Sequence, residues 1–385
     1  MSGTDLVGTV VAVQANFYLV SFESDYHNLE EKARENLADS LLCTRRSRLK
    51  KIGQKVMVGD RVVVEEPDWA GGRGAIAEVL PRQTVLTRPP IANADRILLM
   101  FALAEPDLDP LVLSRFLVKA ESTGLGVTLC LNKCDLATEE EILHWRDRLS
   151  AWGYEPFFIS VKSDIGICEK APYNSASLAV ELSLGPARIG TAMLPKPSAR
   201  EKNKITVVSG SSGVGKSSLI NRLIPELDLR VGEVSGKLAR GRHTTRHVEL
   251  FQLPMGGLLA DSPGFNQPQL ECEPQESIYL FPEGRERLAA GSCQFSDCLH
   301  RSEPNCVVRG EWERYEYYLM FLEEAIARQE ALQQQPDAES SLKAKTKAGG
   351  KRKLEPRLES KKYRRYSRRV EHQKLQELCE ELEEW

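Results

Sequence analysis

The first 80 residues alternate short runs of β-branched and aromatic residues with turn residues. The runs that predict strands are 6–13, 17–22, 55–58, 61–65 and 75–80. Several short strands joined by Gly-containing turns are typical of a small closed barrel. The pattern therefore predicts an N-terminal β-barrel of the OB type over residues 1–85, a fold that often binds RNA.

From residue 92 the pattern changes to buried strands that alternate with amphipathic helices. Continuous apolar runs, typical of parallel strands covered on both faces, lie at 96–104, 126–131, 156–160 and 204–209. Helical periodicity separates them at 110–121 and 139–152. This succession predicts a doubly wound α/β domain over residues 90–270. Within it, the Pro, Ser and Gly content of residues 164–203 suggests a surface insertion.

The C-terminal part divides into a Cys-rich segment and a charged tail. Residues 271–310 are irregular and rich in cysteine, and a helical pattern runs from 311 to 333, which predicts a small domain over 271–335. In the tail, 336–385, residues 343–369 hold 13 Lys and Arg against 2 Glu, a net charge of 13 − 2 = +11. A segment so poor in apolar residues is expected to be disordered when free.

Composition narrows the class of protein. Apolar residues make up 41% of the 385 positions and charged residues 28%, which excludes wholesale disorder. A net charge of −3 excludes a uniformly basic coat for nucleic acid, although local patches are still possible. Apolar runs are shorter than the roughly 18–20 residues that span a bilayer, and the N-terminus resembles neither a signal nor a transit peptide. We expect a cytoplasmic monomer without a membrane partner.

The strongest chemical motif comes directly after the apolar run 205–208. It reads Gly210-Ser211-Ser212-Gly213-Val214-Gly215-Lys216-Ser217, and a helical run starts at Ser218. The glycines let backbone N–H groups surround a β-phosphate, and the helix N-terminus adds the positive end of its dipole. Lys216 would reach the β- and γ-phosphates, and the Ser217 hydroxyl would hold Mg²⁺.

A second motif, Asn132-Lys133-Cys134-Asp135, comes directly after the run 126–131. The Asp135 carboxylate can accept hydrogen bonds from guanine N1–H and the 2-amino group, which adenine does not offer, and so select GTP. Asn132 would tie this loop to the phosphate loop, and the Lys133 stem would lie along the base. Ser160, at the end of the next strand, is a candidate base contact or an ordinary strand-end serine.

Two further segments complete a phosphate site. Asp261 lies just after the apolar run 257–260, where a carboxylate could join the Mg²⁺ shell. Thr244 and Thr245 compete for the last Mg²⁺ position, and we favour Thr245. Many GTPases carry a water-orienting glutamine after the Asp-x-x-Gly motif, but here Phe265 stands there. Unassisted hydrolysis should therefore be slow; His243 is a candidate for orienting the water, or an ordinary loop residue.

The order of the motifs is inverted relative to the usual GTPase, because Asn132 precedes Gly210. A permuted chain can close the same sheet, since its ends can move to a surface loop without changing the core. The domain then ends just after Asp261, so that loop is tethered to the Cys-rich segment.

The Cys-rich segment contains the pattern Cys293-x4-Cys298-x-His300-x5-Cys306. Three thiolates and one imidazole match a closed tetrahedral zinc site with a structural role. The remaining cysteines are scattered, and the low overall count argues against a secreted disulfide scaffold.

Together, the permuted motif order, the barrel before it and the Cys₃His group after it resemble the circularly permuted, ribosome small-subunit-dependent GTPases, or RsgA-type ribosome biogenesis GTPases. The resemblance covers roughly residues 5–330. It implies an OB domain, a permuted GTPase domain and a zinc domain. It also implies GTP hydrolysis stimulated by the small (30S) ribosomal subunit, with a role in late maturation of that particle through rRNA contacts. The hydrophobic residue in place of glutamine, here Phe265, is also a trait of that family.

Two alternatives remain open on the sequence alone. The protein could be a GTP-regulated module that binds a non-ribosomal RNA, or a P-loop protein that uses ATP and in which Asp135 selects no base. The basic cluster Arg45, Arg46, Arg48, Lys50 and Lys51, and the +11 tail, are each either solvated charge or contacts for RNA phosphates.

Overall fold

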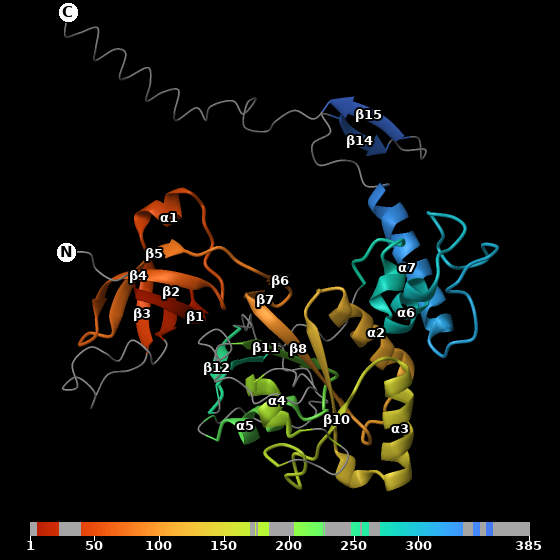
Figure 1. Ribbon diagram of the computed structural model, residues 1–385. Helices are drawn as coiled ribbons and strands as arrows, with labels where there is room; N and C mark the ends of the chain where they lie inside the picture. Colours follow the sequence, from red (N-terminus) through yellow and green to blue (C-terminus); the bar gives the residue numbers. More distant parts are fainter. Residues whose placement is uncertain are drawn as a thin grey trace, which may run out of the picture. The chain divides into compact units, whose positions relative to one another are not determined.

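The computed structural model (Figure 1) describes residues 6–22, 40–169, 174, 176–184, 204–225, 227, 248–254, 256–261, 270–333, 342–346 and 352–356. The chain divides into two units, Met1–Ala325 and Ile326–Trp385, and each is considered by itself. Among the helices of these residues, none has the length and apolar character that a bilayer crossing requires.

The N-terminal barrel is present. Its five strands close in the order β1-β2-β3-β5-β4 (Figure 1). They are β1 (Leu6–Gln14), β2 (Phe17–Phe22), β3 (Ser40–Arg45), β4 (Arg61–Asp68) and β5 (Arg73–Val79). Alternate residues point inward, and Val10, Val20, Val62 and Ile76 form a fully buried interior.

Two details of the barrel differ from the prediction. Residues 55–58 are not a strand: Val58 makes only an isolated bridge to Ile91. The chain turns there at Gly59 (φ +87°), where a Cβ would lie 2.0 Å from the Ala92 carbonyl oxygen. The third strand is instead β3, and three residues of the basic cluster, Arg48, Lys50 and Lys51, lie in the short helix α1 (Ser47–Lys51) that follows it.

The central domain is an α/β fold, as predicted. Its six-stranded sheet has the order β10-β9-β8-β11-β13-β12. All neighbouring strands are parallel except β12, which pairs antiparallel with β13 at one edge. The strands are β8 (Ala94–Ala102), β9 (Gly126–Asn132), β10 (Phe157–Phe158), β11 (Ile205–Gly210), β12 (Leu250–Gln252) and β13 (Leu258–Asp261). A two-stranded sheet, β6 (Val85–Thr87) and β7 (Pro90–Ala92), precedes it.

Helices cover both faces of this sheet (Figure 1). Residues of β8 alternate between two hydrophobic clusters: Ile97 and Leu99 pack with α2 (Pro110–Glu121) and α3 (Glu139–Ala151). Leu98 and Met100 pack on the other side with α4 (Leu178–Leu184) and α5 (Lys216–Leu223). A continuous apolar strand is therefore explained by burial on both faces.

Helix α4 corrects part of the predicted surface insertion. Leu178 and Leu182 of α4 are buried in the sheet core, and Arg96 of β8 forms a buried ion pair with Glu181 at 2.8 Å. Burial of this apolar face overrides the loop-like composition of the flanking sequence. Residues 185–203 lie outside the described residues.

An irregularity in β1 brings one barrel side chain into contact with the central domain. The register of β1 against β2 shifts between Val10 and Ala12. Val11 is thereby turned away from the barrel and belongs to the hydrophobic core of the central domain, while Ala12 bridges Glu249 just before β12. Bulges commonly re-aim a side chain in this way.

After the sheet, residues 270–325 form what we call the Cys-rich lobe. It contains the 3₁₀ helix η4 (Ser277–Leu280), α6 (Pro282–Ala290) and the start of α7 (Tyr315–Gln333). Phe281 is its centre, with ring contacts to Trp312, Tyr318 and Phe321.

In the second unit, β14 (Leu342–Thr346) and β15 (Arg352–Pro356) pair antiparallel. The predicted disorder of the tail is wrong for these residues. Gly349-Gly350 lies between the two strands in sequence. Glycines between two strand-like segments indicate a hairpin, and a count of charges does not reveal this.

Candidate nucleotide site and metal site

The predicted phosphate and guanine motifs meet at one edge of the sheet. Gly210 ends β11, Asn132 ends β9 and Asp261 ends β13. Parallel pairing places these carboxyl ends together, because Met100 of β8 lies opposite both Gly210 and Cys130. Ligands of open α/β sheets bind at this edge. Sequence positions far apart are thus adjacent despite their inverted order.

Two glycines of the phosphate loop are required by close approach. At Gly210 (φ +143°) an added Cβ would lie 1.9 Å from the Met100 carbonyl oxygen. At Gly215 (φ +97°) it would lie 2.6 Å from Nδ2 of Asn132. Only glycine fits both the backbone conformation and the space.

Asn132 joins three loops. Its side chain is 3% exposed, and its Nδ2 donates to the Val214 carbonyl oxygen in the phosphate loop at 2.8 Å. Its Oδ1 accepts from the Val161 N–H at 3.1 Å. The link to the phosphate loop is the one that the motif predicted. Val161 was missed, because a backbone N–H leaves no trace in the residue type.

Lys216 and Asp261 lie near each other where β11 and β13 end, which we call the phosphate side of the site. The Lys216 amine donates to the carbonyl oxygens of Gly210 (3.0 Å) and Ser211 (2.7 Å). Burial lowers the pKa of Lys216, and the Asp261 carboxylate partly offsets this. Ser217 and Ser218 are half-buried on the first turn of α5. A hydroxyl and a carboxylate are hard oxygen donors, and so this set fits Mg²⁺.

Residues 132–138, which we call the guanine loop after the base it is predicted to bind, have a defined backbone. Lys133 adopts φ +63° and starts the 3₁₀ helix Cys134–Leu136, and its amine donates to the Glu105 carbonyl oxygen. The Cys134 N–H donates to the Ile159 carbonyl oxygen at 3.1 Å, and Asp135 is exposed. Burial, assisted by the Asp135 charge, raises the pKa of the Cys134 thiol to about 11.

Ser160 is fully buried, and its hydroxyl accepts from the Ser163 N–H at 3.0 Å. It lies beside the guanine loop, but its contact with a base stays a prediction. Thr244, Thr245, His243 and Phe265 lie outside the described residues, so their predicted roles also stay predictions.

The four residues of the predicted metal site come together in the Cys-rich lobe. The ligand atoms of Cys293, Cys298, His300 and Cys306 lie within 4.8 Å of one another. Nδ1 of His300 is 3.5, 3.4 and 3.3 Å from the sulfurs of Cys293, Cys298 and Cys306, and two sulfurs are 3.9 Å apart. Tetrahedral bonds of zinc to sulfur and nitrogen give edges of about 3.5–3.8 Å. The donor set and its spacing therefore fit this ion.

Backbone hydrogen bonds fix the loops that carry these ligands. The Tyr318 hydroxyl donates to the Leu299 carbonyl oxygen and the Tyr315 hydroxyl to that of His300, both at 2.7 Å. The Glu303 carboxylate accepts from the N–H groups of Leu299, Arg301 and Ser302. Such contacts around the ligands orient them before a metal binds.

A basic pocket of about 390 Å³ lies on the barrel. Its lining includes Thr44, Arg45, Arg46, Ser47, Glu66 and Arg73. Arg45 is held by the Gln54 carbonyl oxygen at 2.9 Å and lies over the Tyr18 ring. Arg46 is paired with Glu66 at 2.7 Å. Part of the predicted basic cluster thus lines a concave surface, while Arg48, Lys50 and Lys51 lie on α1.

Comparisons with known proteins agree with this arrangement. The sequence model described as RsgA GTPase matches residues 79–185 and 191–271. A protein of Trichormus variabilis named "Small ribosomal subunit biogenesis GTPase RsgA" is 62% identical, over 98% of this chain and 98% of its own. A protein of the same name from Synechocystis sp. is 49% identical, over 98% and 96% of the two chains.

Two solved structures share the fold. YjeQ from Thermotoga maritima matches with a TM-score of 0.63 and 28% identity, over 84% of this chain and all (100%) of that one. YloQ, described as a circularly permuted GTPase, matches with a TM-score of 0.61 and 29% identity, over 85% and 96% of the two chains.

Proposed function

The chain belongs to the RsgA GTPase family and is a GTPase of ribosome biogenesis; from that premise we propose that it binds and hydrolyses GTP where β8, β9, β11 and β13 end, in late maturation of the small ribosomal subunit. The observation that carries the proposal is the hydrogen bond from Asn132 to Val214. It holds the guanine loop and the phosphate loop together as one site.

Each residue of the site would have its own part in binding and hydrolysis. Backbone N–H groups of 210–218 surround the phosphates, and Lys216 leaves the carbonyl oxygens of Gly210 and Ser211 to neutralise the transferring phosphoryl group. Asp135 accepts from the guanine edge, with the Lys133 stem along the base and Ser160 beside it. Ser217 and Asp261, with Thr245, would hold Mg²⁺, which neutralises phosphate charge. His243 would orient the attacking water.

Binding to RNA is proposed for the barrel, the Cys-rich lobe and the +11 tail. The basic pocket supports a phosphate contact on the barrel, since guanidinium groups and hydroxyls are the usual partners of phosphate oxygens. In the lobe, Cys293, Cys298, His300 and Cys306 would hold one structural zinc ion. We expect the protein to act as a cytoplasmic monomer on the 30S particle.

Displacement of a fluorescent GDP from the purified protein tests the nucleotide. We expect GTP and GDP to compete and ATP to fail at a hundredfold excess, because adenine lacks the donors that Asp135 accepts. Equal competition by ATP would reject the guanine assignment.

Co-sedimentation tests the partner. With a non-hydrolysable GTP analogue the protein should pellet with 30S particles, and 30S should raise GTP turnover at least about tenfold, as for GTPases that need a partner to complete the site. A matched excess of unrelated RNA should not compete. Binding that unrelated RNA removes, without stimulation by 30S, would instead indicate a regulator of another RNA.

A further inference from the structure

A buried arginine of the Cys-rich lobe contacts the end of helix α3 in the central domain. Arg314 is 0% exposed, and its Nε donates to Glu283 at 2.8 Å. Its Nη2 donates to the Trp152 carbonyl oxygen at 3.3 Å, just past the end of α3. The guanidinium lies 4.8 Å from the centre of the Trp152 ring and 5.6 Å from that of Tyr154. This buried charge, paired with Glu283 and bonded to the Trp152 carbonyl oxygen, ties the lobe to the end of α3. Its Nη1 has no hydrogen-bond partner among the residues that the structure describes.

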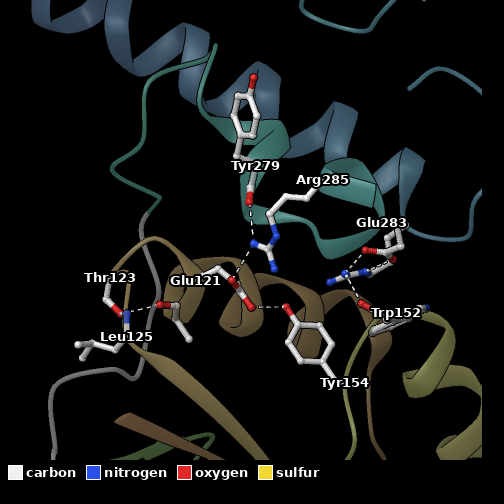
Figure 2. Close-up of polar contacts among 10 residues, drawn as sticks. Glu121, Thr123, Leu125, Trp152, Tyr154, Tyr279, Glu283 and Arg285 are labelled. Atoms are coloured by element: carbon white, nitrogen blue, oxygen red, sulfur yellow. Dashed lines mark hydrogen bonds and ion pairs between the residues drawn. The ribbon is translucent and has the colours of Figure 1, made fainter. Parts of the chain in front are cut away.

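A second contact joins the lobe to α2 (Figure 2). The Glu121 carboxylate at the end of α2 accepts from Arg285 of α6 at 2.9 Å and from the Tyr154 hydroxyl at 3.0 Å. Glu121 therefore connects α2, the segment after α3 and the lobe. The Arg285 guanidinium is itself fixed by the Tyr279 carbonyl oxygen at 2.8 Å.

Further pairs extend this junction along both helices. Arg115 of α2 makes a bidentate pair with Glu324, with both N···O distances 2.6 Å. Glu313 accepts from Arg148 of α3 at 2.5 Å and from the Trp152 indole at 2.7 Å. Gly153 (φ +87°) lies so close to α6 that a Cβ would be 2.7 Å from Cβ of Pro282.

The other ends of the same helices bound the guanine loop. Helix α3 starts at Glu139, and its capping residue Thr138 is separated from Asp135 by two residues. The segment that leads into α2 is bonded to the loop twice: the Leu103 N–H donates to the Asn132 carbonyl oxygen at 3.0 Å, and Lys133 donates to Glu105. A helix of 13 residues such as α3 spans about 20 Å at 1.5 Å per residue. Two rigid rods thus connect the lobe to the loop.

We propose that Arg314, Arg285 and Glu121 are positioning residues for guanine recognition: by gripping α2 and α3, the Cys-rich lobe fixes the loop that carries Asp135. The inference rests on the proposed guanine site. Because Asp135 is exposed, its place relative to a base depends on the backbone of residues 132–138, and α2 and α3 hold that backbone. By thermodynamic linkage, GDP must then stabilise the contacts of the lobe with α2 and α3 by the same factor by which those contacts raise the affinity for GDP.

The test compares GDP with inosine diphosphate, which lacks the 2-amino group and so offers Asp135 one donor fewer. Isothermal titration of the full chain gives the ratio of the two affinities. In Arg285→Gln and Glu121→Gln the preference for GDP over inosine diphosphate should fall at least about threefold. The reason is that a displaced Asp135 carboxylate would lose its hydrogen bond from the 2-amino group, which is the contact that this ratio measures. Arg146→Gln is the matched control: Arg146 lies on α3 but pairs with its neighbour Asp147, and its ratio should equal that of the wild type.

A merely structural role would lower stability without changing the ratio, so an unchanged ratio in both variants overturns the proposal. If the wild type itself does not prefer GDP over the inosine nucleotide, the assignment of Asp135 fails instead, which separates the two claims. Hydrogen exchange of the wild type gives an independent readout: GDP should slow exchange of the amides of α6. Equal exchange with and without GDP would contradict the linkage.

Discussion

Replacement of Asn132 by alanine is the most direct perturbation of the proposed site. The change removes two buried hydrogen bonds, to the Val214 carbonyl oxygen at 2.8 Å and from the Val161 N–H at 3.1 Å. Both backbone groups lose their side-chain partner. At about 1–1.5 kcal/mol for each lost hydrogen bond, we expect the free energy of unfolding to fall by about 2–3 kcal/mol.

The same change should weaken nucleotide binding. Without Asn132, the phosphate loop and the guanine loop are no longer tied, and GDP must hold both in place itself. We expect the affinity for GDP to fall at least tenfold, which corresponds to about 1.4 kcal/mol. Isothermal titration measures the affinity, and urea unfolding measures the stability.

Asn174→Ala provides the matched control. Asn174 is also buried, at 5% exposed, and makes two hydrogen bonds to backbone, from the Phe158 N–H at 2.9 Å and to its carbonyl oxygen at 3.0 Å. Its amide bonds to β10, not to the phosphate loop. Asn174→Ala should therefore lose similar stability but keep its GDP affinity within twofold. An equal loss of affinity in the two variants would refute the reasoning, because affinity would then track stability.

Three other outcomes are expected. Asp135→Asn should lose guanine preference and gain xanthosine diphosphate, because an amide can accept from N1–H and donate to the C2 carbonyl; a displacement assay decides this. Iodoacetamide should modify the exposed Cys168 at pH 8 well before Cys134, whose thiolate forms only as the pH approaches a pKa of about 11; peptide mass spectrometry compares the two rates, and equal rates would contradict the burial of Cys134. Cys306→Ser should lose bound zinc in elemental analysis, whereas Cys272→Ser, in the same lobe but outside the cluster, should keep one ion per chain.

Much of the fold could be predicted because its signals are local. Residues 97–102 of β8 are all apolar, as expected for a strand that is covered on both faces. The strand β3 was missed because its alternation, Leu41 and Cys43 inward with Leu42 and Thr44 outward, is short and runs into arginines. Helix α4 was missed because its buried face is only two turns long.

The candidate site likewise contains residues with a local sequence signal and residues without one. Gly210, Lys216 and Asn132 could be found because the chemistry needs those residue types at fixed spacing. Val161 acts through its backbone N–H, which any residue except proline could supply. Arg314 and Trp152 are 162 positions apart in sequence, so their contact depends on the packing of the lobe on α3. Neither a local pattern nor a motif contains that information.

The inverted order of the motifs explains why one lobe can reach both sides of the site. In the sheet, β11 lies between β8 and β13, and β9 lies beyond β8. The strand that ends in the phosphate loop and the strand that ends in the guanine loop can therefore keep these positions whichever comes first in the sequence. The order changes the point at which the chain leaves the domain. It leaves after Asp261 on the phosphate side and enters the lobe at residue 270, nine positions later (270 − 261 = 9). The lobe is thus covalently joined to the phosphate side, while Arg314 and Arg285 bind it to the helices that hold the guanine loop. A partner that moves the lobe would therefore act on both halves of the nucleotide site.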